Sequence, residues 1–356
     1  MSNARKLADN LPTDGQLSGR NVIINGAMNV SQRTTSATGL GGGSGYYTVD
    51  RYKTQTVGAT AGRYTMEQAG ITDLAGFHNC IKLSCTTADT SIGGSESLLF
   101  RQIIEGQDLQ RFAKGTSDAK EFTVSFYVKG NANATYTCEL FDSDNSRQIS
   151  KTFSVTTSWT RVILTFPADT TGAFTDDNGV SLYVTIWLSA GPNYSSGTLN
   201  SSAWASQTTG NRASGSQTSF FDSTSRTFFV TGLQLEVGPR ATPFEHEPVG
   251  VTLSKCQRYF EKVSDGLNQH RLLGVPWDTN SINVYFPYLV EKRAYPAVTI
   301  VSPGQTYKSG GWHTNTGSTV VGAGTRGCTL EIQVSNLTAG TGVFIRNHSL
   351  TIDAEL

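Results

Sequence analysis

Apolar and polar residues alternate with a period of two in three stretches near the middle of the chain. These stretches cover residues 122–129, 159–166 and 180–188. Because successive side chains of a β-strand point to opposite faces of its sheet, each stretch predicts a strand with one face in a core and the other toward solvent. The side chains that we expect in the core are Phe122, Val124, Phe126, Val128, Val162, Leu164, Phe166, Leu182, Val184, Ile186 and Leu188.

Shorter apolar runs predict further strands on either side of these three. An opening strand is expected over residues 22–28, with a turn signal at the Asn-Gly pair of Asn25 and Gly26. A closing strand is expected over 228–237, which is rich in β-branched and aromatic residues and is followed by Pro239 and Pro243. Other strands are predicted at 62–68, 79–86 and 98–105.

One segment has helical spacing instead. Leu253, Cys256, Tyr259 and Phe260 fall on one stripe of a helix predicted over 253–263, and strand-like alternation returns after residue 265. We therefore divide the chain into an N-terminal arm (1–20), a β-sandwich domain (21–246), a linker and helix (247–264) and a smaller C-terminal β-domain (265–356).

The composition supports an all-β fold. Charged residues are only 16% of the 356 residues, below the roughly 25% typical of soluble domains, and 37 residues are glycine. Ser, Thr, Asn and Gly are abundant in place of charged residues, and they are typical of short strands joined by tight turns. We predict a jelly-roll β-sandwich followed by one helix and a smaller β-domain.

Charge and hydropathy argue against several classes of function. The 28 basic residues balance the 28 acidic ones, so the protein has no net positive charge with which to attract nucleic acid. No apolar run approaches the roughly 20 residues that span a bilayer, and the N-terminus does not resemble a signal peptide, so we expect no membrane insertion and folding in a cytoplasm. The five cysteines include no CxxC pair and are expected to be buried apolar residues.

No stretch of the chain carries a complete catalytic or ligand-binding motif. The glycine-rich segment 39–45 lacks the order of a phosphate-binding loop, and Asp142 to Ser146 lacks the Gly and Glu of a calcium-binding EF-hand. The carboxylates that a glycosidase would need have no identifying motif. We predict no catalytic residue, no metal and no cofactor.

The solvent-facing side of the three alternating strands is the most promising surface. If these strands share a sheet, five side chains lie together on it: Tyr127, Lys129, Arg161, Tyr183 and Trp187. Aromatic rings and planar polar groups of this kind bind sugars, but they are also enriched where subunits or domains pack. Sugar contact, subunit or domain packing and simple exposure all remain open. The long segment 191–218 is predicted to be a functional or mobile loop.

Several phrases resemble those of tailed-bacteriophage virion proteins, notably tail fibres. These are GLQLEVG at 232–238, ATPFEH at 241–246 and CQRYFEK at 256–262. In that family the first two phrases end a jelly-roll that is similar to carbohydrate-binding modules, and the third follows it. The segment around Asp50 and Arg51 and the strand over 158–166 resemble parts of the same module. Such modules often hold a structural calcium, but Ala27, Asn29 and the Thr231-Gly232 pair stand here at the matching positions.

The resemblance implies a role in the virion, most simply as a tail fibre that attaches to the host and contacts a surface glycan. It implies a homotrimer whose threefold axis buries Leu253, Cys256, Tyr259 and Phe260. It also implies that the arm joins other virion proteins, with Asn3, Ala4, Arg5, Lys6 and Leu7 as candidate contacts. The alternative for the arm is packing on its own domain. The alternatives for the chain are a capsid-decorating or head-fibre protein and, less favoured, a polysaccharide-degrading enzyme.

Overall fold

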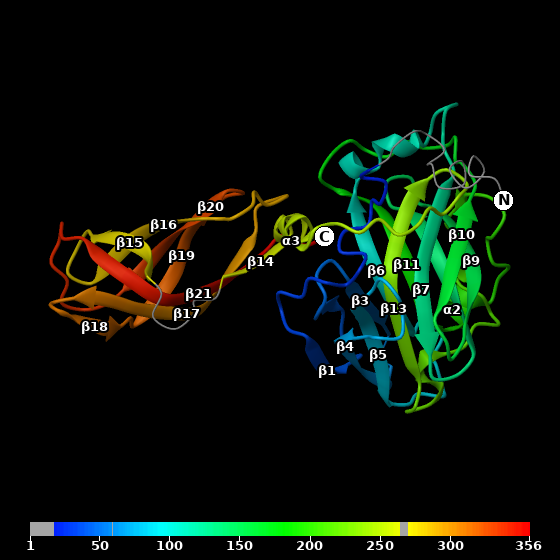
Figure 1. Cartoon of the computed structure of the whole chain (residues 1–356), viewed down its shortest axis with the longest axis horizontal. Helices are drawn as coiled ribbons and strands as arrows, with labels where there is room; N and C mark the ends of the chain where they lie inside the picture. The colour runs from blue at the N-terminus through cyan, green and yellow to red at the C-terminus, as the bar shows by residue number, and fades with distance from the viewer. Residues whose placement is uncertain (1–17, 59, 264–269) are drawn as a thin grey trace. The chain divides into compact units, whose positions relative to one another are not determined.

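The computed structural model describes residues 18–58, 60–263 and 270–356, and it divides the chain into two compact units. The first unit extends to Thr252 and includes the terminal Leu356, and the second runs from Leu253 to Glu355. Figure 1 shows that each unit is built mainly from strands. The candidate contacts of the arm, Asn3 to Leu7, lie outside the described residues.

Two antiparallel sheets form the first unit. One sheet has the order β1 (Ser36–Leu40), β4 (Arg63–Gly70), β5 (Asn79–Thr87), β13 (Thr227–Val237), β7 (Phe122–Gly130) and β10 (Thr160–Phe166). The other has the order β12 (Ala205–Ser206), β9 (Arg147–Val155), β8 (Ala134–Asp142), β11 (Val180–Ala190), β6 (Ser97–Glu105), β3 (Lys53–Val57) and β2 (Gly45–Tyr46). Neighbouring strands are often distant in sequence, as in a jelly roll.

The core of this unit lies between the two sheets. All eleven side chains predicted to be inward are buried in it, including Phe122, Phe166 and Leu182. Period-two alternation therefore identified the core face of β7, β10 and β11 correctly. Short 3₁₀ turns over Gly106–Asp108, Gln110–Phe112, Thr209–Asn211 and Phe220–Asp222 connect the strands.

Three predictions about local structure were wrong. Residues 22–28 form consecutive turns instead of a strand, and Asn25 holds them by donating to the carbonyls of Val30 at 2.9 Å and Asp50 at 3.1 Å. The strands β8 and β9 were missed, because β8 is covered on both faces and its alternation is weak. The 191–218 segment is not a free loop, since it includes α2 (Pro192–Ser195) and β12 and packs on the second sheet.

The helix was only partly predicted. Helix α3 covers Val249–Gln257, and the chain then turns into strand β14 (Phe260–Val263), which pairs with β21. Phe260 therefore lies on a strand and not on the predicted helical stripe. The backbone N–H of Ala354 donates to the carbonyl of Tyr259 at 2.7 Å, which fixes the change of direction.

The second unit is a second β-structure with its own core. Its sheet has the order β18 (Gly311–Thr314), β17 (Ala297–Lys308), β21 (Val343–Asp353), β15 (His270–Pro276), β16 (Ser281–Pro287), β20 (Gly327–Gln333) and β19 (Gly317–Ala323). Alternate residues such as Ile282, Leu330 and Ile345 fill the core. The all-β prediction is confirmed. Among the described residues, no helix has the length and hydropathy needed to cross a membrane.

Candidate functional site

The five side chains predicted to share one surface lie on two different sheets. Tyr127, Lys129 and Arg161 belong to the sheet of β7 and β10, whereas Tyr183 and Trp187 are on β11, which pairs with β6 and β8. The three strands look alike in sequence but occupy opposite layers of the sandwich. The prediction of a single surface was therefore wrong.

The outer face of the first sheet is largely covered. The ring of Phe77 lies 5.3 Å from that of Tyr127, and Arg161 donates a hydrogen bond to the carbonyl of Thr242. The Lys129 ammonium pairs with Asp73 at 2.5 Å and lies over the ring of Trp159. These contacts form a small second apolar cluster rather than an open platform.

The outer face of the second sheet is covered by the 191–218 segment. Trp187 is only 1% exposed, and its indole N–H donates to Oε2 of Glu139 at 2.9 Å. Arg212 from the covering segment holds the same carboxylate through two hydrogen bonds, at 2.7 and 2.9 Å. Tyr183 lies beneath the guanidinium of Arg101, 5.0 Å from the ring centroid. Neither aromatic residue offers an open ring face to a sugar.

The acidic turn that begins at Asp142 surrounds a buried lysine. The Lys114 ammonium lies 2.6 Å from Asp142 and 3.1 Å from Asp169, and it donates to the carbonyls of Thr171 and Gly172. Arg147 also binds Asp169, at 2.7 Å. In the part of the chain that the structure describes, no group of three or more His, Cys, Asp or Glu side chains is arranged to hold a metal.

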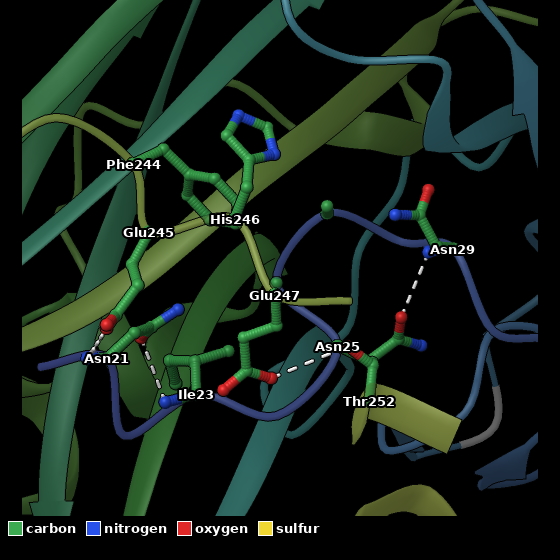
Figure 2. Close-up of a pocket in the computed structure, with 11 residues that line it drawn as sticks. Asn21, Ile23, Asn25, Asn29, Phe244, Glu245, His246, Glu247 and Thr252 are labelled. Atoms are coloured by element: carbon green, nitrogen blue, oxygen red, sulfur yellow. Dashed lines mark hydrogen bonds between the residues drawn. The ribbon is translucent and has the colours of Figure 1, made fainter. Parts of the chain in front are cut away.

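A small pocket lies where the start of the sandwich meets the segment after β13 (Figure 2). Its volume is about 20 Å³, which is room for about one water molecule. The Glu245 carboxylate accepts hydrogen bonds from the backbone N–H groups of Arg20 at 2.7 Å and Asn21 at 2.9 Å. Asn21 in turn accepts from the N–H of Ile23 at 3.0 Å. The ATPFEH phrase thus anchors the start of the sandwich, and the pocket is too small for a sugar.

The residues predicted to meet at a threefold axis are mostly covered by the chain itself. Cys256, Tyr259 and Phe260 are buried, and Leu253 is half-buried. Side chains that already lie inside a folded unit leave little surface for a neighbouring subunit.

An open groove of about 510 Å³ lies on the second unit, alongside β16, β19 and β20. Two tyrosines are among the residues that line it, and their side chains are far more exposed than those of the predicted surface: 59% for Tyr285 and 81% for Tyr295. The rest of the lining is small or polar: Gly322, Ala323, Gly324, Thr325, Arg326, Gly327, Cys328 and Thr329. These residues form the candidate site, which we call the tyrosine groove.

Glycine at position 327 lets Tyr285 lie against the sheet. Tyr285 points outward from β16, because its neighbours Val284 and Phe286 are in the core. A Cβ atom at Gly327 would lie only 2.3 Å from the Tyr285 hydroxyl oxygen. Any larger residue there would push the ring away, so Gly327 keeps one side of the groove in place.

The connection between β16 and β17 carries Tyr295 and is held by a buried ion pair. The Lys292 ammonium donates to Oε2 of Glu261 at 2.7 Å and to the carbonyl of Gln257 at 2.5 Å. Burial lowers the pKa of Lys292, and the hydrogen bond to Glu261 opposes that shift. The backbone N–H of Lys292 also donates to the carbonyl of Thr325 at 2.8 Å. The connection is therefore tied to the turn that also lines the groove.

Polar groups at the rim are ordered by Glu291. Its carboxylate lies 3.2 Å from the Arg326 guanidinium and accepts a hydrogen bond from the Thr325 hydroxyl at 3.1 Å. The hydrogen bond from Arg326 is the main reason that the pKa of Glu291 is below its ordinary value. Arg326 thus has one acidic partner beside the groove, in a pair that is exposed to solvent.

This arrangement is suited to recognising a sugar. Tyrosine rings pack against the apolar C–H face of a pyranose, while hydroxyl and guanidinium groups bond to its hydroxyls. Sequence reasoning did not find the groove, because β16 and β20 show only ordinary alternation and Tyr295 lies outside any strand. The turn sequence from Gly322 to Gly327, rich in glycine beside Thr and Arg, was the available signal.

Comparison with known proteins found no matching family model and no matching curated protein. Among solved structures, a structure described as "CBM4 structure and function" aligns at 10% identity with a TM-score of 0.32, over 60% of this chain and 97% of that one. A TmCBM61 structure in complex with β-1,4-galactotriose aligns at 9% identity with a TM-score of 0.30, over 62% of this chain and 99% of that one.

The enzymatically active domain of tailspike protein 4 from bacteriophage CBA120 aligns at 9% identity with a TM-score of 0.29. That alignment covers 61% of this chain but only 21% of the tailspike chain. At these identities and TM-scores, the similarities carry no conclusion about the ligand or the activity of this protein.

Proposed function

We propose that this chain is a non-enzymatic attachment protein of a tailed-phage particle and that its tyrosine groove contacts a glycan on the host surface. The observation that carries the proposal is the pair of exposed tyrosines, Tyr285 and Tyr295, which line one open groove together with a glycine-rich turn that carries Arg326. The resemblance of residues 232–246 and 256–262 to tail-fibre phrases supports the phage assignment.

The lining of the groove supports binding rather than hydrolysis. A glycosidase needs two carboxyl groups about 5 to 9.5 Å apart around the scissile bond. The described residues that line the groove include no Asp or Glu, and Glu291 at the rim is engaged by Arg326 and Thr325. A hydrolase is the second candidate, and release of reducing ends from host polysaccharide by the purified chain would establish it.

Binding of host surface polysaccharide to the purified chain tests the proposal. Replacing Tyr295 by Leu removes the aromatic ring but keeps an apolar side chain. We expect a loss of affinity of roughly tenfold, taking a sugar–aromatic contact to be comparable to base–aromatic stacking, which is worth about 1–3 kcal/mol. Tyr295→Phe keeps the ring and should bind within about threefold of the natural chain. Equal binding by the Leu and Phe variants would refute stacking at this position.

Attachment to the particle is tested separately. Removal of residues 1–17, which keeps the hydrogen bonds of Gly19 and Arg20 to Glu245, should abolish incorporation of the protein into phage particles while polysaccharide binding by the purified chain is kept. Imaging of labelled protein on complete particles distinguishes the two locations, since a tail position fits a fibre and a shell position fits a capsid-decorating protein. Incorporation that persists after the deletion would refute the role of the arm.

A further inference from the structure

Large exposed apolar side chains gather on the second unit, on the outer face of β15 and its neighbours. Leu273 and Val275 on β15 are 68% and 53% exposed, and Trp277 directly after this strand is 65% exposed. Phe344 on β21 and Tyr307 on β17 are exposed beside them. We call these five residues the β15 patch. By contrast, Ile163 is the one large apolar side chain exposed on the described strands of the sandwich.

Strand register makes the patch continuous. Leu273 is the direct partner of Phe344, and Phe344 is the direct partner of Tyr307 on the next strand. Tyr307 is in turn opposite Trp312 on β18, with ring centroids 5.3 Å apart. Directly paired residues point to the same face of a sheet, so an apolar band crosses four neighbouring strands.

The chemistry of the patch differs from that of the tyrosine groove. Its centre is aliphatic, at Leu273 and Val275. Its five side chains carry no charge and only two polar groups, the Tyr307 hydroxyl and the Trp277 indole N–H. A contiguous exposed apolar surface of this kind marks a protein–protein contact, in which an uncharged centre with aromatic residues is surrounded by a polar rim.

The rim of the patch carries opposite charges on its two sides. Arg346 is on β21, on one side of β15, where its guanidinium lies 4.0 Å from the Trp312 ring centroid and its Nε donates to Gln305 at 2.9 Å. Glu331 is on β20, two strands away on the other side of β15, and it is opposite Asn283 in the register. Two copies of this surface can therefore face each other with their apolar centres in contact, the Arg346 side of each copy lying against the Glu331 side of the other.

We propose that copies of this chain associate through the β15 patch, with the Glu331 side of one copy against the Arg346 side of the next. Closed symmetric oligomers repeat one contact around an axis, so a surface with opposite charges on its two sides satisfies both charges in every copy. The proposal does not rest on glycan binding, because association is measured on the chain alone. The patch and the tyrosine groove share no residue, but Tyr285 lies on the same outer face, two positions along β16 from Asn283, the partner of Val275. It also moves the expected subunit contact away from the buried Cys256, Tyr259 and Phe260.

Light scattering during size-exclusion chromatography of the full chain provides the first test. The chain alone has a mass of 38.3 kDa, so the natural protein should elute at an integral multiple of this value. Leu273→Asp places a charge in the centre of the patch without touching the core, and we expect it to reduce the mass to 38.3 kDa. Ile163→Asp, at a similarly exposed strand position of the sandwich, should leave the oligomer intact.

Charge reversal provides the second test. Glu331→Arg alone and Arg346→Glu alone should each weaken association at least tenfold, because each places like charges across the contact. The double variant restores opposite charges and should recover most of the association. A natural chain that is monomeric at every concentration, an oligomer that survives Leu273→Asp, or a double variant no better than either single one would overturn the proposal.

Discussion

At the scale of single residues, the most informative observation is that buried charged side chains hold separate segments of the chain together. Lys114 is completely buried and surrounded by four oxygen atoms, from Asp142, Asp169 and the carbonyls of Thr171 and Gly172. The acidic turn that looked like an incomplete calcium loop in the sequence is thus neutralised by a lysine from 28 residues upstream. Sequence reasoning identified the turn but had no means of pairing it with that lysine.

Replacing Lys114 by Met should strongly destabilise the first unit. The substitution keeps the volume but leaves the buried Asp142 carboxylate without its cation, whereas Asp169 keeps Arg147. Breaking a buried pair in this way costs about 3–5 kcal/mol. Urea unfolding of both proteins measures the difference. Lys82→Met is the matched control, because the Lys82–Glu67 pair is about one-third exposed on each side and should contribute less than about 1 kcal/mol. Equal losses from both variants would contradict this account.

His348 is expected to make the second unit sensitive to acid. Its side chain is buried, with Nε2 3.1 Å from the Ser318 hydroxyl, and burial lowers its pKa from 6.5 to about 4. The unfolded chain therefore binds a proton more readily than the folded one between these values. The folding stability of the second unit is therefore unaffected by protonation of His348 above pH 6.5, and it falls progressively as the pH decreases from 6.5 toward 4. Thermal unfolding across this range should show a smaller acid-induced fall in Tm for His348→Gln, which cannot titrate.

At the scale of elements, the sandwich shows which features a sequence can and cannot predict. Inward residues such as Phe126 and Leu164 were assigned correctly, because burial of alternate side chains is a local pattern. The sheet to which each strand belongs was not predictable, since partners of β11 and β13 come from distant parts of the chain. The side chains of Asp50 and Arg51 join segments that are far apart in the sequence: Asp50 accepts from the N–H of Gln32 at 3.0 Å, and Arg51 donates to the carbonyl of Ile103 at 2.6 Å.

The 191–218 segment illustrates how side chains can order a polar stretch that looks mobile in sequence. Trp187 and Arg212 converge on Glu139, and the indole also lies 5.2 Å from the ring of Tyr194. The sequence-based expectation that Trp187 is an exposed contact residue does not hold. Because its side chain is buried, Trp187→Ala should cost about 3–5 kcal/mol of folding stability instead of selectively weakening adsorption.

Replacing Arg212 by Met should loosen the 191–218 segment without unfolding the sandwich. The change removes both hydrogen bonds that join the segment to Glu139 and leaves this buried carboxylate with the Trp187 indole. We expect limited proteolysis to cut within 191–218 at least several times faster than in the natural chain. Arg326→Met, at a position that is 79% exposed on the second unit, should leave the cleavage rate unchanged. Resistance equal to that of the natural chain would show that the segment is ordered by other contacts.

At the scale of the whole molecule, the two units have separate cores and different surfaces. The first unit buries its aromatic residues between two sheets and covers both outer faces with its own connections. The second unit has a smaller core and leaves both the tyrosine groove and the β15 patch exposed. The larger core thus lies in the first unit, whereas most of the exposed large apolar side chains lie on the second.

Separate cores predict separate unfolding transitions. Units with their own apolar cores commonly unfold as independent cooperative blocks, so calorimetry of the full chain should resolve two transitions. Phe126→Ala and Ile345→Ala each remove a fully buried side chain, and each should cost about 2–5 kcal/mol. The first change should lower only the transition of the sandwich, and the second only that of the second unit. One transition that both substitutions lower equally would show that the two units unfold as a single cooperative block. In that case, substitutions in the β15 patch would also be expected to affect the stability of the sandwich.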